Sequence, residues 1–251
     1  MADLVLVPGF WLGAWAWAEV AGRLRAAGHR VFPVTLTGLA ERAGEATPEV
    51  DVDTHVGDVI RVIEDNALRN VVLVAHSGAN VPVTMATDRI PDRLARVVYV
   101  EGGPMPDGMA QIDFDPGARD EVERLVRADG DGWRIPVPPF DDPDDPNLAG
   151  LSEAQRALLR ERGTPQPFGT ATQPVRRPAD LPEVPVSVVA CTFRPDVVRQ
   201  LADGGHPVFA LMAGAPVHHL PTGHWPMLSR PADLADLLST VADGAPSPAG
   251  I

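Results

Sequence analysis

The amino-acid sequence predicts an α/β fold, with a mostly parallel sheet covered by helices on both faces and an inserted cap. Short runs rich in β-branched residues alternate with segments whose apolar residues recur at helical spacing, which is typical of parallel α/β proteins. The run at 71–75 is apolar throughout, as expected of a central strand buried on both faces. A length of 251 residues suits one large domain, or a core with one sizeable insertion.

The first half of the core is expected to begin at the N-terminus. A strand at 4–7 and a strand at 31–34 flank an amphipathic helix at 15–27, and Gly28 closes that helix as a C-terminal cap. A second helix is expected at 53–66, where apolar residues recur at helical spacing after an Asp and a Thr that can cap its start.

The central strand and its flanking helix come next. After the apolar strand at 71–75 we expect a helix at 78–89 and a further strand at 96–100, whose sequence is "RVVYV". These elements complete the first segment of the predicted core, residues 1–104.

The alternation stops in residues 105–182, which predict a cap over the core. This stretch is rich in Pro, Gly and Asp, and its helical pieces lie at 117–128 and 152–162. Such a composition does not support another sheet. The acidic stretch "FDDPDDPN" (140–147) is interpreted as an exposed loop, with a calcium site as the weaker alternative.

The alternation resumes in residues 183–243, which complete the predicted core. The expected elements are strands at 186–190 and 217–220 and helices at 197–202 and 232–241. The remaining residues, 244–251, are expected to be a disordered tail.

Charge and cysteine content exclude several classes of protein. A formal net charge of −13 argues against binding a nucleic-acid backbone, which needs a basic face. The single cysteine, Cys191, rules out an intrachain disulfide and a cysteine-rich zinc site. The sequence shows no signal peptide, and no apolar run approaches the length of a membrane span. We therefore expect a cytoplasmic protein with no nucleic-acid or membrane partner and no bound metal.

Ser77 follows the apolar strand in the sequence "VAHSGANVP" and is the first candidate catalytic residue. A serine between small residues, at a turn from a buried strand to a helix, is the pattern of a nucleophile elbow. The sharp turn requires small residues two positions before and two after the serine, and these are Ala75 and Ala79. The alternative is a serine that caps the following helix.

His224 is the candidate base for Ser77. It lies in "LPTGHWPML", after the last predicted strand and before the final helix. In chains with a nucleophile elbow the catalytic histidine occupies this place, and the predicted cap accounts for the long separation from the serine. His76, beside Ser77, is expected to point away from the serine and to be structural.

Several stretches resemble the α/β-hydrolase superfamily, in particular its branch of small esterases and hydroxynitrile lyases. They include "LVLVPGFWLGAWAWAEVAGRLRAAGHRVFPVTLTGLAER", "VVLVAHS", "VVYVEGGPMPDG" and "LPTGHWPMLSRPADLADLL". The branch also contains methyl-salicylate-type and pyrethroid-hydrolase-like esterases. The resemblance implies an α/β-hydrolase fold and an oxyanion hole made by the backbone N–H groups of Phe10 and Gly78. It implies no cofactor.

The acid of the predicted triad is left open between two residues. The resemblance places the acid where this chain has Arg194, and a guanidinium cannot accept the histidine N–H. Asp196 lies two residues further on and could reach His224 through a shifted loop. Glu101 ends the strand after the elbow helix, a position from which some relatives supply their acid, and we favour it.

The function predicted from these residues is that of a serine hydrolase acting on a hydrophobic carboxylic ester through an acyl-enzyme. The expected pocket walls are Trp11, Met105, Phe168 and Trp225. One alternative is a lyase or cyclase of secondary metabolism that uses the same serine and histidine as acid–base groups. Another is a ligand-binding protein without catalysis. A homodimer is left open.

Overall fold

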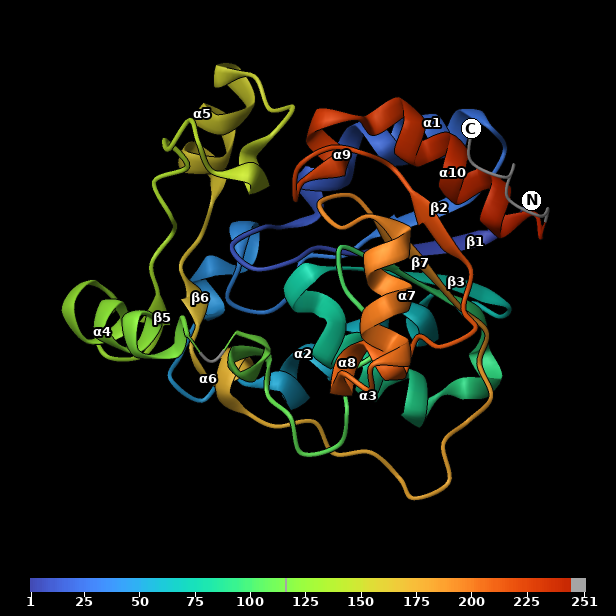
Figure 1. Cartoon of the computed structure of the whole chain (residues 1–251), viewed down its shortest axis with the longest axis horizontal. Coiled ribbons are helices and arrows are strands. Elements are labelled where there is room, and N and C mark those ends of the chain that lie inside the picture. The colour runs from blue at the N-terminus through green and yellow to red at the C-terminus, as the bar shows by residue number, and fades with distance from the viewer. Residues whose placement is uncertain (116, 245–251) are drawn as a thin grey trace.

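Six parallel strands form the centre of the protein, in the order β2-β1-β3-β4-β7-β8 (Figure 1). The computed structural model describes residues 1–115 and 117–244. The strands are β1 (Asp3–Val7), β2 (Arg30–Pro33), β3 (Val71–His76), β4 (Leu94–Val100), β7 (Val186–Ala190) and β8 (Val217–His219). This sheet confirms the predicted fold class.

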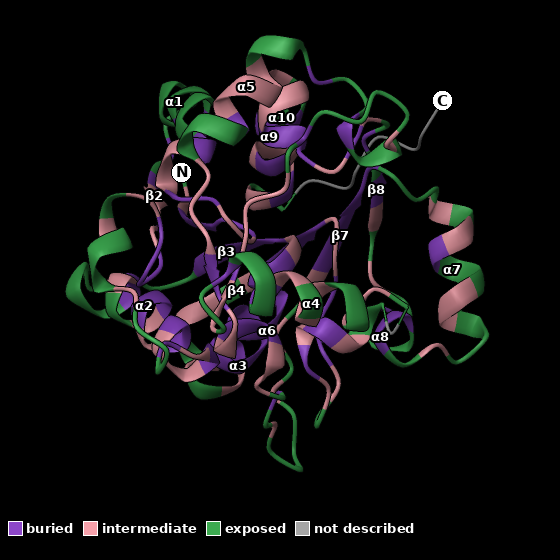
Figure 2. Ribbon diagram, turned by 90° about the vertical axis from the view of Figure 1, so that its left-hand side faces the viewer, coloured by how far each residue is buried: buried purple, intermediate pink, exposed green. Residues whose placement is uncertain are grey.

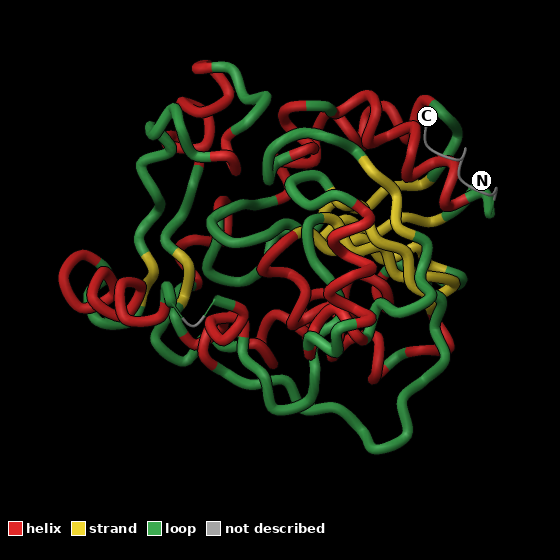
Figure 3. Tube along the Cα trace, in the orientation of Figure 1, coloured by secondary structure: helices red, strands yellow, loops and turns green. Residues whose placement is uncertain are grey.

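Helices cover both faces of the sheet (Figures 1 and 3). One face carries α1 (Ala18–Ala26), α9 (Pro226–Ser229) and α10 (Pro231–Ala242). The other carries α2 (Val52–Asp65), α3 (Asn80–Arg89), α7 (Pro195–Asp203) and α8 (Pro207–Ala210). No helix within 1–115 or 117–244 is long and apolar enough to cross a membrane.

Alternate residues of each strand enter two separate apolar cores. On β3, Leu73 and Ala75 belong to the core beneath α2 and α3, whereas Val72 and Val74 belong to the core beneath α1 and α10. All four are at most 2% exposed. Figure 2 shows the strands buried between exposed helix surfaces. Burial on both faces explains why the sequence of this strand has no polar alternation.

The sheet has a reversal of strand order between β1 and β3. The chain leaves β1 for β2 on one side and returns to β3 on the other. The carboxyl ends of two such strands form a crevice, which is the usual ligand site of an open parallel sheet. The loops that carry Phe10 and Ser77 leave these two strands.

The residues predicted as a cap, 105–182, lie mainly beyond the carboxyl ends of the strands (Figure 1). Their helices are α4 (Arg119–Asp129), α5 (Glu153–Arg162) and α6 (Gly169–Thr172). The expectation that this stretch contains no sheet is wrong, because β5 (Arg134–Ile135) and β6 (Gln166–Pro167) pair antiparallel. Strands of two residues are too short to show a periodicity in sequence. The division into core and cap stays a prediction.

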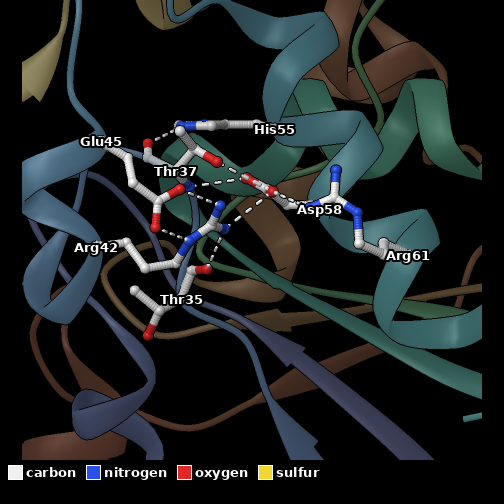
Figure 4. A network of polar contacts seen from close by, with 7 residues as sticks. All are labelled: Thr35, Thr37, Arg42, Glu45, His55, Asp58 and Arg61. Carbon is white, nitrogen blue, oxygen red and sulfur yellow. Dashed lines mark hydrogen bonds and ion pairs between the residues drawn. The ribbon is translucent and has the colours of Figure 1, made fainter. Parts of the chain in front are cut away.

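The connection from β2 to α2 is fixed by the buried carboxylate of Asp58 (Figure 4). Its oxygens accept hydrogen bonds from Thr37 N at 2.7 Å, Thr37 Oγ1 at 3.0 Å and an Arg42 guanidinium nitrogen at 2.9 Å. His55 Nε2 donates to the Thr37 carbonyl at 2.9 Å. Side chains of α2 therefore hold the connection that precedes this helix.

The ends of several helices differ by a few residues from the prediction. Helix α2 begins after Asp51, whose side chain accepts the N–H of Thr54 in a capping box, so neither Asp53 nor Thr54 is the cap. Helix α10 ends at Ala242. Of the predicted tail, 245–251 lies outside the described residues.

Candidate active site

Ser77 occupies a sharp turn between β3 and α3. Its φ is +49°, in the left-handed region that non-glycine residues adopt only where the surroundings impose it. A short 3-10 turn, Ser77–Ala79, leads directly into the helix. Ala75 and Ala79 are both fully packed, at 0% and 1% exposure, so the turn leaves no room for larger side chains. The serine therefore has the backbone geometry of a nucleophile elbow.

The imidazole of His224 contacts the Ser77 hydroxyl. His224 Nε2 lies 2.7 Å from Ser77 Oγ, although the two residues are 147 positions apart. When Nε2 accepts the hydroxyl proton, the ring proton sits on Nδ1, which lies 3.4 Å from Oε2 of Glu101. Catalytic contacts of this length commonly tighten when substrate binds. Ser77, His224 and Glu101 thus form a continuous chain of polar contacts.

Glu101 is held at the end of β4 by groups from the loop after β7. Its Oε1 accepts the N–H groups of Cys191 at 2.5 Å and Thr192 at 3.0 Å, and its Oε2 accepts the Thr192 hydroxyl at 2.5 Å. The side chain is only 3% exposed. Burial alone would raise the pKa of Glu101, but hydrogen bonds from His224, Thr192 and Cys191 outweigh burial and lower it. The carboxylate is therefore ionised and oriented.

Asp196, the alternative acid, is not brought to His224. Its side chain is 60% exposed and forms an ion pair with Arg194 at 3.0 Å. The residue lies in the first turn of α7, where the helix dipole favours an acidic side chain. Among the described residues, the ion pair of His224 is with Glu101.

The loops after β1 and β3 are packed tightly against each other beside Ser77. A Cβ added to Gly9 would lie 3.0 Å from the Ser77 Cβ, and one added to Gly78 would lie 2.3 Å from the Phe10 ring. Only glycine permits these two approaches. The contact brings the loop of Phe10 against the turn of Gly78, as a shared oxyanion hole requires.

A cavity of about 390 Å³ opens above Ser77. Aromatic side chains form much of its wall; these are Phe10, Trp11, Phe140 and Trp225. Trp11 and Trp225 thus lie where the sequence places pocket walls. Asp141, Asp142 and Asp145 line the same cavity, and none of the described residues that line it is an arginine or lysine.

Two of the expected wall residues do not line this cavity. Met105 is fully buried in the core beneath α2 and α3, and its backbone N–H donates to Thr84 Oγ1. Phe168 packs in a small cluster with Phe10 and Trp11. The prediction for Met105 is wrong, because an apolar side chain near a site can be part of the packing beneath it. Phe168 is half-buried and stays a prediction.

His76 supports the loop that carries His224, through a contact that sequence reasoning missed. Its Nε2 donates to the carbonyl oxygen of His224 at 2.7 Å. Burial, and to a smaller extent the nearby His224, lowers the pKa of His76 to about 3. The ring is therefore neutral at physiological pH, with its proton on Nε2. A histidine next to a serine gives no sequence signal for this role.

The segment before α5 also holds the loop of His224, through two backbone hydrogen bonds. The N–H of His224 donates to the Asn147 carbonyl at 2.7 Å, and that of Gly223 donates to the Ala149 carbonyl at 2.9 Å. A Cβ on Gly223 would lie 2.3 Å from the Asn147 oxygen, so this close approach requires glycine. The backbone of His224 is therefore held through both its N–H and its carbonyl group.

The described residues contain no group of three or more His, Cys, Asp or Glu side chains that could hold a metal ion. The polar groups that the fold brings together here are Ser77, His224 and Glu101, and the first two line the cavity. Their arrangement suits proton transfer and nucleophilic attack.

Comparisons with curated proteins find esterases. A carbendazim hydrolyzing esterase from Nocardioides sp. (strain SG-4G) is 41% identical over 101 residues, 40% of this chain and 42% of that protein. Methylesterase 9 from Arabidopsis thaliana is 32% identical over 108 residues, 43% of this chain and 42% of that protein. The chain thus matches about two fifths of the length of these relatives.

Solved structures match over nearly the whole chain. An extracellular alpha/beta-hydrolase from a Paenibacillus species has a TM-score of 0.77 at 23% identity, covering 96% of this chain and 99% of that one. A variant of tomato methylketone synthase I has a TM-score of 0.76 at 16% identity, covering 97% of each chain. At these identities the likeness shows the fold.

A model of the alpha/beta hydrolase family matches residues 4–237, which is most of the chain. This match and the six-stranded parallel sheet confirm the resemblance noted in the sequence. The protein belongs to the alpha/beta hydrolase family.

Proposed function

We propose that the protein is a serine esterase that cleaves small, uncharged carboxylic esters through an acyl-enzyme. The observation that carries this proposal is the 2.7 Å contact between Ser77 Oγ and His224 Nε2 at an aromatic cavity. The esterase relatives support it.

Acylation begins with attack of Ser77 Oγ on the ester carbonyl. His224 Nε2 takes the hydroxyl proton, and the Glu101 carboxylate stabilises the imidazolium through Nδ1. The N–H groups of Phe10 and Gly78 stabilise the oxyanion, and each such donor contributes about 3 kcal/mol. The proton then passes to the leaving alcohol.

Deacylation repeats these steps with water as the nucleophile. His224 takes a proton from the water, which attacks the acyl carbon, and Ser77 Oγ leaves with that proton. The overall reaction converts an ester and water into a carboxylic acid and an alcohol. None of these steps uses a cofactor.

The lining of the cavity supports an uncharged, partly aromatic substrate. Rings from Phe10, Trp11, Phe140 and Trp225 supply apolar surface. Asp141 and Asp142 repel an anionic group at the same cavity, and its lining in the described part of the chain contains no arginine. A carboxylate-bearing ester therefore fits poorly.

The esterase proposal is tested with pre-steady-state kinetics on an activated neutral ester, comparing the wild type with Ser77→Ala. We expect a burst of alcohol equal to one equivalent of enzyme, and no burst from the variant. Turnover of the ester without any covalent intermediate in either protein would instead favour the lyase or cyclase chemistry of the alternative. A cytoplasmic location and a homodimer remain sequence-based predictions.

A further inference from the structure

A second cavity, of about 250 Å³, lies on the far side of the Glu101–His224 pair. Its walls come from the end of β7, from α7 and α8, and from the short segment after α8. The apolar side chains that form them are Val188, Ala190, Val198, Val208, Phe209 and Met212. An apolar cavity of about 150 Å³ is enough to bind benzene, so this one can hold an alkyl chain or a ring.

The two cavities adjoin at the catalytic histidine. His224 and Asn147 line both of them. Ser77 and Gly78 line only the first, and Glu101 lines only the second. The nucleophile and a predicted oxyanion donor therefore face one cavity, while the acid faces the other.

The mouth of the second cavity is apolar and exposed. Phe114 and Phe193 line it and are 37% and 44% exposed, among the few large apolar side chains at the protein surface. Their rings lie 6.4 Å and 6.1 Å from that of Phe209. Exposed aromatic side chains beside a cavity are typical of a ligand site.

The charges around the second cavity favour an uncharged ligand. Glu101 and Asp115 are its acidic side chains, and no arginine lies among the described residues that line it. An anionic group would be repelled. A cation close to Glu101 would compete for the carboxylate that His224 contacts.

We infer that this second cavity binds the alcohol half of the ester, and that this half is an uncharged alkyl or aryl group. The inference rests on the proposed esterase function. His224 must return its proton to the leaving oxygen, so that oxygen has to pass beside the histidine. The carbonyl carbon and acyl half lie with Ser77 and Gly78 in the first cavity. The alcohol half then extends past His224, where the second cavity begins.

The reaction balances in this arrangement. The bond from Ser77 Oγ to the acyl carbon forms as the bond from that carbon to the alcohol oxygen breaks. The serine proton moves through His224 to the alcohol oxygen. The free alcohol leaves from the second cavity, and the acyl group stays on Ser77 in the first.

The test compares two matched series of esters. In one, acetates carry alcohols from methyl to hexyl; in the other, methyl esters carry acyl groups from acetyl to hexanoyl. We expect kcat/KM to rise with alcohol length by about fourfold per methylene until the second cavity is full. Val208→Phe fills this cavity, because Val208 is 1% exposed and lines it. The variant should lower the hexyl-to-methyl ratio of the acetates at least tenfold and leave the ratio within the acyl series unchanged.

A matched control adds the same ring outside the cavity. Leu211 follows α8, is 38% exposed and does not line the second cavity. Leu211→Phe should leave both ratios as in the wild type. The assignment of the alcohol half to this cavity is wrong if Val208→Phe lowers the hexanoyl-to-acetyl ratio of kcat/KM instead. It is also wrong if the variant lowers this ratio and the hexyl-to-methyl ratio equally.

A binding measurement separates this inference from the esterase proposal. Met212 lines the second cavity, whereas Met227 belongs to the core beneath α1 and α10, on the other face of the sheet. In Ser77→Ala protein with ¹³C-labelled methionine methyl groups, 1-hexanol should shift the Met212 signal and leave the Met227 signal in place. Without that shift the inference is overturned, even if esters are hydrolysed. A shift in Ser77→Ala, together with a folded wild type that hydrolyses no ester, would overturn the esterase proposal and show a cavity for a neutral apolar ligand.

Discussion

Glu101 Oε2 lies 3.4 Å from Nδ1 of His224. The two residues follow different strands, because Glu101 comes directly after β4 and His224 comes after β8, and β7 lies between these strands in the sheet. The loop after β7, where the sequence resemblance places the acid, supplies hydrogen-bond donors instead. Cys191 and Thr192 both donate to the Glu101 carboxylate. In the proposed triad the acid therefore lies on another strand than the resemblance implies, and the loop after β7 orients it.

Replacing Glu101 by Gln is expected to lower kcat by about 10³- to 10⁴-fold, because the neutral amide neither fixes the Nδ1–H tautomer nor stabilises the imidazolium. Asp196→Asn removes an exposed carboxylate and should retain wild-type kcat. Steady-state hydrolysis of one neutral ester by both variants measures the two values of kcat. Equal losses, or a larger loss in Asp196→Asn, would rule out Glu101 as the acid.

His76 is expected to act as a positioning residue through the His224 carbonyl. His76→Leu removes the donor and should lower kcat by about 10- to 100-fold with little change in KM, because a small misplacement of a catalytic group is costly. His76→Gln can keep an N–H at the Nε2 position and should recover most of that loss. If the Leu and Gln variants show the same kcat at equal stability, the hydrogen bond has no role in catalysis.

The depressed pKa of His76, about 3, predicts a loss of stability in mild acid. An unfolded histidine binds a proton near pH 6.5, whereas buried His76 does not. The contribution of neutral His76 to the free energy of unfolding is therefore complete above pH 6.5 and falls as the pH decreases toward 3. Between pH 7 and 5 the wild type should lose about 2 kcal/mol more than His76→Gln, as measured by urea unfolding. Parallel curves for the two proteins would mean that His76 takes up its proton in the folded state.

Asp58→Ala is expected to destabilise the protein by about 1–3 kcal/mol, because it leaves the buried N–H and hydroxyl of Thr37 without their acceptor (Figure 4). Arg42 loses one acceptor and keeps its ion pair with Glu45. Asp65→Ala, an exposed change on the same helix, should shift the free energy of unfolding by less than about 0.5 kcal/mol. Similar unfolding midpoints for both variants would show that the network contributes little.

Much of the sheet could be predicted from the sequence, because its strands are short, apolar and separated by periodic helices. Strand β7 was expected at 186–190, which are its bounds in the structure. The pair β5 and β6 was missed because two residues carry no periodicity. Helix α2 was expected one residue late, since Asp51 and Asp53 are both suitable caps and only the fold selects one.

At the site, the sequence predicts the residues whose places follow from the order of strands and helices along the chain. It does not predict the contacts that depend on how side chains pack. Ser77 and His224 follow parallel strands whose carboxyl ends lie at the same edge of the sheet, so their approach could be predicted from the chain order of the fold. Met105 was misjudged because its side chain turns into the core. The hydrogen bond between Asn147 and His224 joins two loops that are far apart in the sequence, and no local sequence pattern predicts it.

The most direct test of the central claim is to treat the protein with a fluorophosphonate and to map the adduct by mass spectrometry, with Ser77→Ala and His224→Ala alongside. We predict one adduct per chain, on Ser77, none in Ser77→Ala, and labelling slowed at least 10²-fold in His224→Ala. Folded wild-type protein that forms no adduct, or forms one at another residue, would contradict the claim that Ser77 is a nucleophile activated by His224.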